Sequence, residues 1–108
     1  MQYYFFIFLF LHPLFSCIDG LEIELWEVCY NIEETTILDL SGTQISGSIP
    51  EKIGDLENLI ELNLSLNNLD GDIPTQIGNL TNLVILNLSL NNLSGVIPAS
   101  VSNLINLI

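Results

Sequence analysis

The sequence predicts an α/β fold in which short repeated units stack along one axis. Two observations support this prediction. The segments "LNLSLNNLDGDIPTQIGNL" and "LNLSLNNLSGVIPASVSNL" begin at Leu62 and Leu86 and share nearly all of their apolar positions. Equivalent leucines at Leu56, Leu80 and Leu104 recur every 24 residues. A fixed period of this length is typical of supersecondary units that share one continuous core.

Each unit begins with a short strand. In "ELNLS", Leu62 and Leu64 alternate with Glu61, Asn63 and Ser65. Successive side chains of a strand point to opposite faces, so the two leucines face the core and the other three face solvent. The leucines that follow are more widely spaced, because the chain must curve round and return to the same core.

The return segment of each unit is predicted to lack a regular α-helix. Gly71 relieves the turn after the strand, and Pro74 and Gly78 bracket at most one helical turn. A single unit buries too little apolar surface to offset the ordering of its backbone. Stacking closes that gap, because strands of neighbouring units pair about 4.8 Å apart and their leucines pack together.

A fainter copy, "ILDLSGTQISGSIPEKIGDL", precedes the two clear units and keeps their apolar register. The pattern LxxLxLxxNxL followed by LxGxIPxxIGxL resembles the plant-specific class of the leucine-rich repeat family. This resemblance covers residues 32–108. It implies a right-handed leucine-rich-repeat solenoid with a parallel β-sheet on the concave face and loops or short helical turns on the convex side. The repeats are assigned to residues 32–55, 56–79 and 80–103, with a truncated fourth at 104–108.

The resemblance assigns a structural role to two repeated asparagines. Asn67 and Asn91 occupy the position whose amide turns inward in the family and bonds neighbouring backbone groups, forming an asparagine ladder. The alternative is that both are ordinary turn asparagines. Thr43 stands at this position in the first repeat. Its single hydroxyl can satisfy fewer backbone groups, so the ladder is expected to be weaker there.

The exposed side of the concave strands is where this family binds other molecules. We call the corresponding positions the strand face; they are Ile37, Asp39, Ser41, Glu61, Asn63, Ser65, Leu66, Ile85, Asn87, Ser89 and Leu90. Leu66 and Leu90 are the most informative, because neighbouring exposed leucines form an apolar strip. The alternative is that these are merely solvated strand residues. The surface is smaller than the roughly 20–30 residues per side of a standard interface, so three repeats should bind weakly or as part of something larger.

Residues 21–31 are expected to form a degenerate amino-terminal cap. Trp26 and Cys29 resemble the WxGVxC element that closes the cap of this family, but the helix that normally precedes it is largely missing. The segment "LEIELW" fits strand alternation as well as a helical face. A disulfide between Cys17 and Cys29 would suit an exported chain, provided that Cys17 survives removal of the leader. The alternative is an unpaired, partly buried Cys29.

Residues 1–20 are predicted to be a secretory signal peptide. The apolar run from Tyr3 to Leu11 has the length of a signal-peptide core and is shorter than the ~20 residues that span a bilayer. Cleavage after Ser16 and cleavage after Gly20 are both compatible with the sequence. The protein is therefore expected to be secreted or at the cell surface, and an uncleaved amino-terminal membrane anchor is the alternative.

Export would expose four N-x-[ST] sequons to glycosylation. They begin at Asn63, Asn79, Asn87 and Asn92. The repeat consensus generates "NLS" on its own, so the motif alone is weak evidence. Asn79 is the preferred acceptor because it lies on the loop side of its repeat. A glycan on Asn63 or Asn87 would cover the strand face.

The composition argues against several functional classes. The net charge is −12 and Lys52 is the only basic side chain, so nucleic acid is excluded as a partner. The only histidine, His12, lies in the predicted leader, which removes histidine-based catalysis and zinc binding from the mature chain. We predict that the protein is not an enzyme and binds no metal or small-molecule cofactor.

The leading hypothesis is a recognition module from a plant receptor-like protein that binds a protein or peptide ligand, with a co-receptor as a further partner. The alternatives are a secreted inhibitor resembling polygalacturonase inhibitors and a truncated gene copy without activity. The sequence stops shortly after Leu104, before a fourth strand or a polar capping repeat. We therefore expect the isolated chain to be marginally stable and to self-associate through its carboxy-terminal edge.

Overall fold

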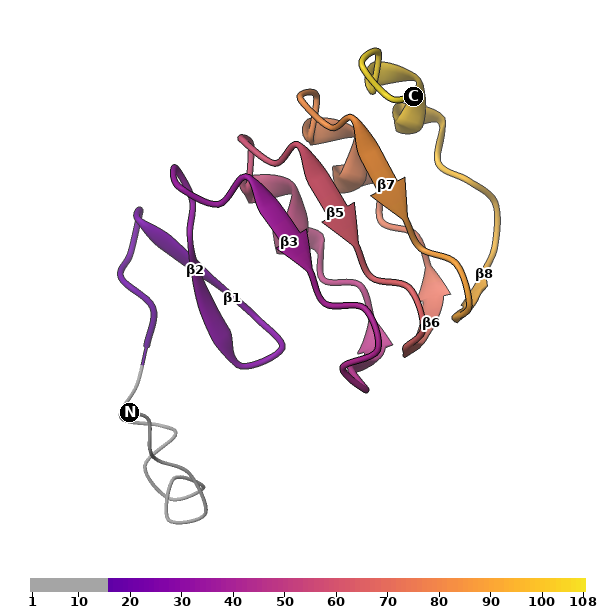
Figure 1. Cartoon of the computed structure of the whole chain (residues 1–108), viewed down its shortest axis with the longest axis horizontal. Coiled ribbons are helices and arrows are strands. Elements are labelled where there is room, and N and C mark those ends of the chain that lie inside the picture. The colour runs from indigo at the N-terminus through magenta and orange to yellow at the C-terminus, as the bar shows by residue number, and fades with distance from the viewer. Residues whose placement is uncertain (1–15) are drawn as a thin grey trace.

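A computed structural model describes residues 16–108 (Figure 1). Most of the predicted signal peptide therefore lies outside the described residues. Figure 1 shows an amino-terminal hairpin followed by repeats that stack side by side, with the carboxy terminus at the far end. We call the three 24-residue repeats the first rung (32–55), the central rung (56–79) and the third rung (80–103).

The first sheet contains one strand from each rung. Its parallel strands are β3 (Ile37–Asp39), β5 (Glu61–Asn63) and β7 (Ile85–Asn87), in that order. Each residue pairs with the residue 24 positions further along the chain, as Leu38 pairs with Leu62. The parallel sheet predicted from the alternation of apolar residues is confirmed.

A second parallel sheet lies where the sequence predicted only turns. Its strands are β4 (Ser46–Ser48), β6 (Asn68–Asp72) and β8 (Asn92–Ser94). Here Gly47 pairs with Leu69 and Gly71 pairs with Leu93, an offset of 22 residues. The first sheet advances by 24 residues per rung, so the strands of the second sheet slide by two residues from one rung to the next.

The return segment of each rung contains a single short 3-10 helix. These are η2 (Glu51–Asp55), η3 (Thr75–Asn79) and η4 (Ala99–Asn103), each preceded by an extended proline. The glycine inside η3 has a packing reason, because a Cβ on Gly78 would lie 2.6 Å from the carbonyl oxygen of Ser100. The predicted short helical turns are thus confirmed.

The amino-terminal cap is an antiparallel hairpin of β1 (Glu22–Leu25) and β2 (Val28–Asn31). "LEIELW" therefore begins as a strand, with Ile23 and Leu25 buried in the core. Trp26 and Glu27 form the tight turn and both have positive φ, 48° and 68°. Two positive φ values in a two-residue hairpin loop match the right-handed twist of the strands.

One continuous apolar core joins the hairpin to all three rungs. It is most complete in the central rung, where the apolar side chains facing inward are fully enclosed: Leu56, Leu59, Leu62, Leu64, Leu69 and Ile77. Of the corresponding third-rung residues, Leu80 and Leu83 are also buried, whereas Leu86, Leu88 and Leu93 are only half-buried. Among residues 16–108, no helix is long and apolar enough to cross a membrane.

Candidate functional site: the strand face

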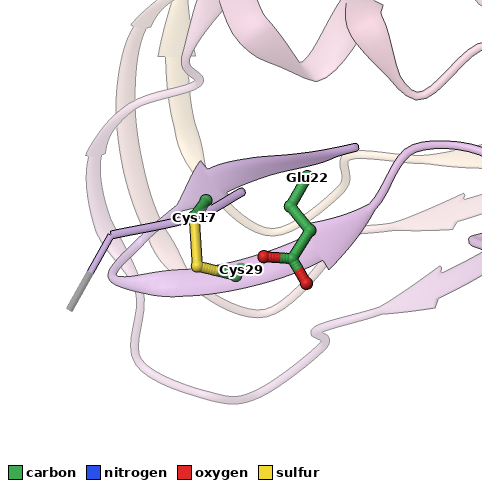
Figure 2. A group of neighbouring side chains, drawn as sticks. All are labelled: Cys17, Glu22 and Cys29. Atoms are coloured by element: carbon green, nitrogen blue, oxygen red, sulfur yellow. A yellow bond between two sulfur atoms is a disulfide. The ribbon is translucent and has the colours of Figure 1, made fainter. Parts of the chain in front are cut away.

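The hairpin is tied to the segment before it by a disulfide. Cys17 and Cys29 are joined, with their Cα atoms 5.5 Å apart (Figure 2). Glu22 lies beside the bridge, and its carboxylate accepts a hydrogen bond from the backbone N–H of Ile18 at 3.0 Å. Within residues 16–108, Cys17, Glu22 and Cys29 form the one group of three potential metal ligands. Both sulfur atoms are bonded to each other, so this group is not available to a metal ion.

Asn67 connects the first and central rungs through its amide. Its Nδ2 donates to three backbone carbonyl oxygens, those of Leu40, Leu64 and Ser65. Its Oδ1 accepts from two backbone N–H groups of the first rung, those of Thr43 and Ile45. The side chain is 9% exposed. A buried amide with this many partners fixes the distance and rotation between the two rungs.

Asn91 makes a similar set of bonds between the central and third rungs. Its Nδ2 donates to the carbonyl oxygens of Leu64, Leu88 and Ser89, and its Oδ1 accepts from the N–H of Leu69. In the first rung, the hydroxyl of Thr43 donates to the carbonyl oxygen of Leu40 within its own rung.

A second column of asparagines, which the sequence analysis missed, supports the strand face from the preceding loops. The Nδ2 of Asn58, Asn82 and Asn106 donate to the backbone carbonyl oxygens of Glu33, Glu57 and Thr81, at 3.0–3.2 Å. Each bond joins neighbouring rungs. The 24-residue recurrence of these asparagines was the signal that could have found them.

The centre of the strand face is a row of three polar side chains, Asp39, Asn63 and Asn87, which we call the polar row. In each, Oδ1 accepts two hydrogen bonds from the serine two residues further on. The backbone N–H donates at 3.0–3.1 Å and the hydroxyl donates at 2.7 Å. The same local geometry therefore recurs on β3, β5 and β7.

These bonds orient the free atoms of the polar row. Because each Oδ1 already accepts two hydrogen bonds, the remaining polar atoms of these side chains are Oδ2 of Asp39 and Nδ2 of Asn63 and Asn87. Within residues 16–108, no hydrogen bond within the chain uses them. The hydroxyl of Ser41, and next its backbone N–H, hold the pKa of Asp39 below its usual range. The row thus presents one charged acceptor followed by two amide donors.

Ser65 differs from the expectation that it lies on the contact surface. It is 6% exposed, its hydroxyl donates to Asn63, and its carbonyl oxygen accepts hydrogen bonds from the backbone N–H of Gly42 and from Nδ2 of Asn67. Its central rung has a neighbour on each side. Its equivalents are more accessible, Ser41 half-buried and Ser89 exposed. We therefore remove Ser65 from the surface available to a partner.

Leu66 and Leu90, which we call the apolar strip, follow the strands in the left-handed region with φ of 58° and 57°. Gly42 takes the same conformation in the first rung, with φ of 65°. An L-residue in this region costs roughly 1–2 kcal/mol relative to the right-handed conformation. Burial does not offset that cost, because Leu66 and Leu90 are 59% and 69% exposed. Both side chains therefore stay in solvent, side by side in adjacent rungs, despite the cost of their backbone conformation.

The opposite end of the strand face borders an open hollow. It has a volume of about 420 Å³ and is lined by Thr36, Asn58, Ile60, Asn82 and Val84. Ile37 and Ile85 are exposed on the strands between this hollow and the polar row. The strand face therefore combines a polar centre with apolar side chains at both ends of its strands.

The four sequons fall into two structural groups. Asn63 and Asn87 are half-buried in the polar row. Asn79 is exposed at the end of η3, and Asn92 is exposed in β8 of the second sheet. A glycan on either exposed residue would start outside the strand face.

The leucine rich repeat family model matches residues 34–56, 58–80 and 82–104. The complex of BIR3 with SERK2 from Arabidopsis thaliana shares 44% identity over 70% of this chain and 42% of that chain, with a TM-score of 0.66. The ectodomain of the Arabidopsis receptor kinase HAESA, in complex with a peptide hormone ligand, shares 42% identity over 70% of this chain and 13% of that chain, with a TM-score of 0.68. The BIR2 ectodomain from Arabidopsis thaliana shares 38% identity over 69% of this chain and 40% of that chain, with a TM-score of 0.67.

The chain thus spans less than half of each of these similar structures. No curated protein sequence matches it. The three matched repeats cover more than half of the chain and coincide with its three stacked rungs. This chain belongs to the leucine-rich repeat family.

Proposed function

We propose that this chain is a protein- or peptide-recognition module of a plant receptor-like protein and that the strand face is its contact surface. The observation that carries the proposal is the set of outward-facing side chains that three parallel strands hold in fixed rows. The similarity to receptor ectodomains supports it, since one of those structures contains a peptide hormone and another is a protein complex.

The size of the surface suggests how the module works. Three rungs offer fewer contact residues than a standard interface, so the affinity of this chain alone is expected to be weak. A protein or peptide ligand held jointly with a co-receptor fits such a surface. The alternatives of a secreted enzyme inhibitor and of an inactive gene copy stay untested predictions.

The module acts outside the cell in this proposal. Residues 1–20 include the leader, and the Cys17–Cys29 bridge supports cleavage after Ser16, because cleavage after Gly20 would remove Cys17. A disulfide is also stable in an oxidising compartment. The mass of the exported chain distinguishes the two cleavage sites from an uncleaved amino-terminal anchor.

Glycosylation is proposed at the two exposed sequons, Asn79 and Asn92. Their position outside the strand face leaves the contact surface open. Asn63 and Asn87 are expected to stay unmodified, because their amides form part of the polar row. Mass spectrometry of glycopeptides from exported protein measures the occupancy of each sequon. Dominant occupancy of Asn63 or Asn87 would contradict this assignment.

Proximity labelling in plant tissue tests the recognition function. The exported chain, fused to a labelling enzyme, is compared with a variant that combines Ile37→Glu and Ile85→Glu on the strand face. A matched control combines Thr75→Glu and Ala99→Glu at the first positions of η3 and η4. All four substituted residues are exposed, and both variants change the charge equally.

Wild type and the control should label the same extracellular proteins or peptides, and the strand-face variant should lose them. Partners that survive the Ile37 and Ile85 substitutions would show that recognition does not use the strand face. A chain retained in the cytosol would rule out the extracellular role.

A further inference from the structure

We propose that the strand face binds an extended peptide segment with one basic side chain, a more specific claim that rests on the recognition function proposed above. Three features define this ligand: two carboxylates, the polar row and the apolar strip. Each of them restricts the chemistry of the partner in a different way.

The charged groups of the strand face are both acidic. They are Asp39 and Glu61, and the single basic residue of the chain, Lys52, lies in η2 outside the strand face. Ile37 pairs with Glu61, so the two carboxylates stand one strand and two residues apart. Strand spacing and rise place the Cα atoms of these two residues roughly 8 Å from each other.

The two carboxylates favour an organic cation over a metal ion. A bound divalent cation needs several oxygen ligands, and within residues 16–108 neither Asp39 nor Glu61 belongs to a group of three potential metal ligands. An ammonium or guanidinium group has several N–H donors and can make charge-assisted interactions with both carboxylates. The negative charge of the whole chain, −12, also attracts basic partners to this surface.

The polar row favours an extended backbone over a helix. The Nδ2 groups of Asn63 and Asn87 face outward as donors on neighbouring strands. An extended peptide that crosses the strands has carbonyl oxygens free to accept from them. The carbonyl groups of a helix are already used within the helix, except in its last turn.

The apolar strip sets a second requirement on the ligand. Leu66 follows Asn63 by three residues, and Leu90 stands in the next rung, with the backbone N–H of Leu66 donating to Ser89. Asp39 is therefore roughly 10–14 Å from the strip, estimated from strand spacing and rise. An extended ligand covers this distance with three or four residues. In the ligand, an apolar residue should thus stand three or four positions before or after the basic residue.

Selection from a random peptide display library on the immobilised exported chain tests this inference. The recovered peptides should be enriched in Arg or Lys, with an apolar residue three or four positions away. A synthetic peptide of the enriched sequence then serves as the probe for binding measurements. The variant that combines Asp39→Asn and Glu61→Gln should bind this probe about tenfold more weakly.

A control variant separates recognition from net charge, and a second test variant separates it from folding. Glu33→Gln with Glu34→Gln removes the same charge from two exposed residues outside the strand face, and binding should stay nearly unchanged. Leu66→Gly with Leu90→Gly removes the apolar strip but suits the left-handed backbone, so the melting temperature should not fall through backbone strain. Binding of the probe should nevertheless weaken severalfold.

Neutral or acidic consensus peptides, or no enrichment at all, would overturn the inference. An equal loss of binding in the Asp39/Glu61 and Glu33/Glu34 variants would overturn it as well, because the effect would then be one of net charge. None of these results decides whether the strand face recognises some other protein surface. The proximity labelling with the Ile37 and Ile85 variant decides that separately.

Discussion

The central and third rungs contain almost the same sequence but differ in burial. Both include "LNLSLNNL", which starts at Leu62 in one and at Leu86 in the other. Leu62 and Leu64 are fully buried, whereas Leu86 and Leu88 are half-buried. The central rung has a neighbour on both sides. Burial in this fold therefore depends on the adjacent rungs more than on the sequence of a rung itself.

The polar groups show the same contrast. The amide of Asn67 joins five backbone groups and is 9% exposed, while that of Asn91 joins four and is half-buried. Ser65 is buried, and its equivalent Ser89 is exposed. We therefore expect the central rung to contribute most to stability, while the third rung leaves more of its strand face accessible.

The largest expected effect comes from shortening a core leucine in each rung. Leu64→Ala should lower the free energy of unfolding by about 3–5 kcal/mol, because it leaves a cavity that neighbours on both sides enclose. Leu88→Ala should cost only about 1–2 kcal/mol, since its side chain already contacts solvent and loses fewer contacts. Urea denaturation followed by circular dichroism measures both values. Equal losses would show that the two rungs are packed alike.

A smaller difference is expected for the two ladder asparagines. Asn67→Ala leaves several buried backbone groups without partners and should cost about 2–4 kcal/mol. Asn91→Ala should cost about half as much, because water can reach the groups that it leaves. The same denaturation experiment measures both. A greater loss for Asn91 would contradict the ranking of the rungs.

A polar capping repeat appended after Ile108 would give the third rung a second neighbour. Leu86, Leu88 and Leu93 would then become buried, and Val96 and Ile97, now exposed, would be partly covered. The melting temperature should rise by about 5–10 °C. Sedimentation should change from concentration-dependent association to a monomer, because the open strand edge is covered. A chain that is already monomeric and gains no stability from the cap would refute this account.

The sequence predicted the elements whose pattern comes from core leucines. Alternation at Leu62 and Leu64 identified the first sheet, and Pro74 with Gly78 identified the short helical turn. The second sheet was missed for a physical reason. Its strands include "SGS" and "NLS", which have low intrinsic strand propensity, and they form because the stacked rungs bring their backbones together.

The strand face could be predicted as a set of positions but not in its local detail. The alternation of apolar and polar residues shows that the side chains of Asn63 and Ser65 point away from the core. It does not show that Ser65 bonds back to Asn63 or that only 6% of Ser65 stays exposed. Nor does it show the left-handed backbone at Leu66, since that conformation normally favours glycine. The hydrogen bond and the left-handed backbone recur in every rung, whereas the burial of Ser65 differs from that of Ser41 and Ser89 and so depends on the neighbouring rungs.

The smallest expected effect concerns a titration that separates the first rung from the other two. Hydrogen bonds from Ser41 hold the pKa of Asp39 below its value in the unfolded chain. They therefore stabilise the fold at a pH above the unfolded pKa. This contribution is lost as the pH falls through the folded pKa. Ser41→Ala removes the hydroxyl bond and should raise the pKa of Asp39, measured by NMR titration of its carboxyl carbon. Ser89→Ala is the matched control, because it removes the same bond from Asn87, which does not titrate. The melting temperature of Ser41→Ala should therefore fall furthest below that of wild type near neutral pH, and the difference should shrink in acid. Any difference in melting temperature between Ser89→Ala and wild type should not depend on pH. An unchanged Asp39 pKa in Ser41→Ala would show that the serine does not set the charge at this end of the polar row.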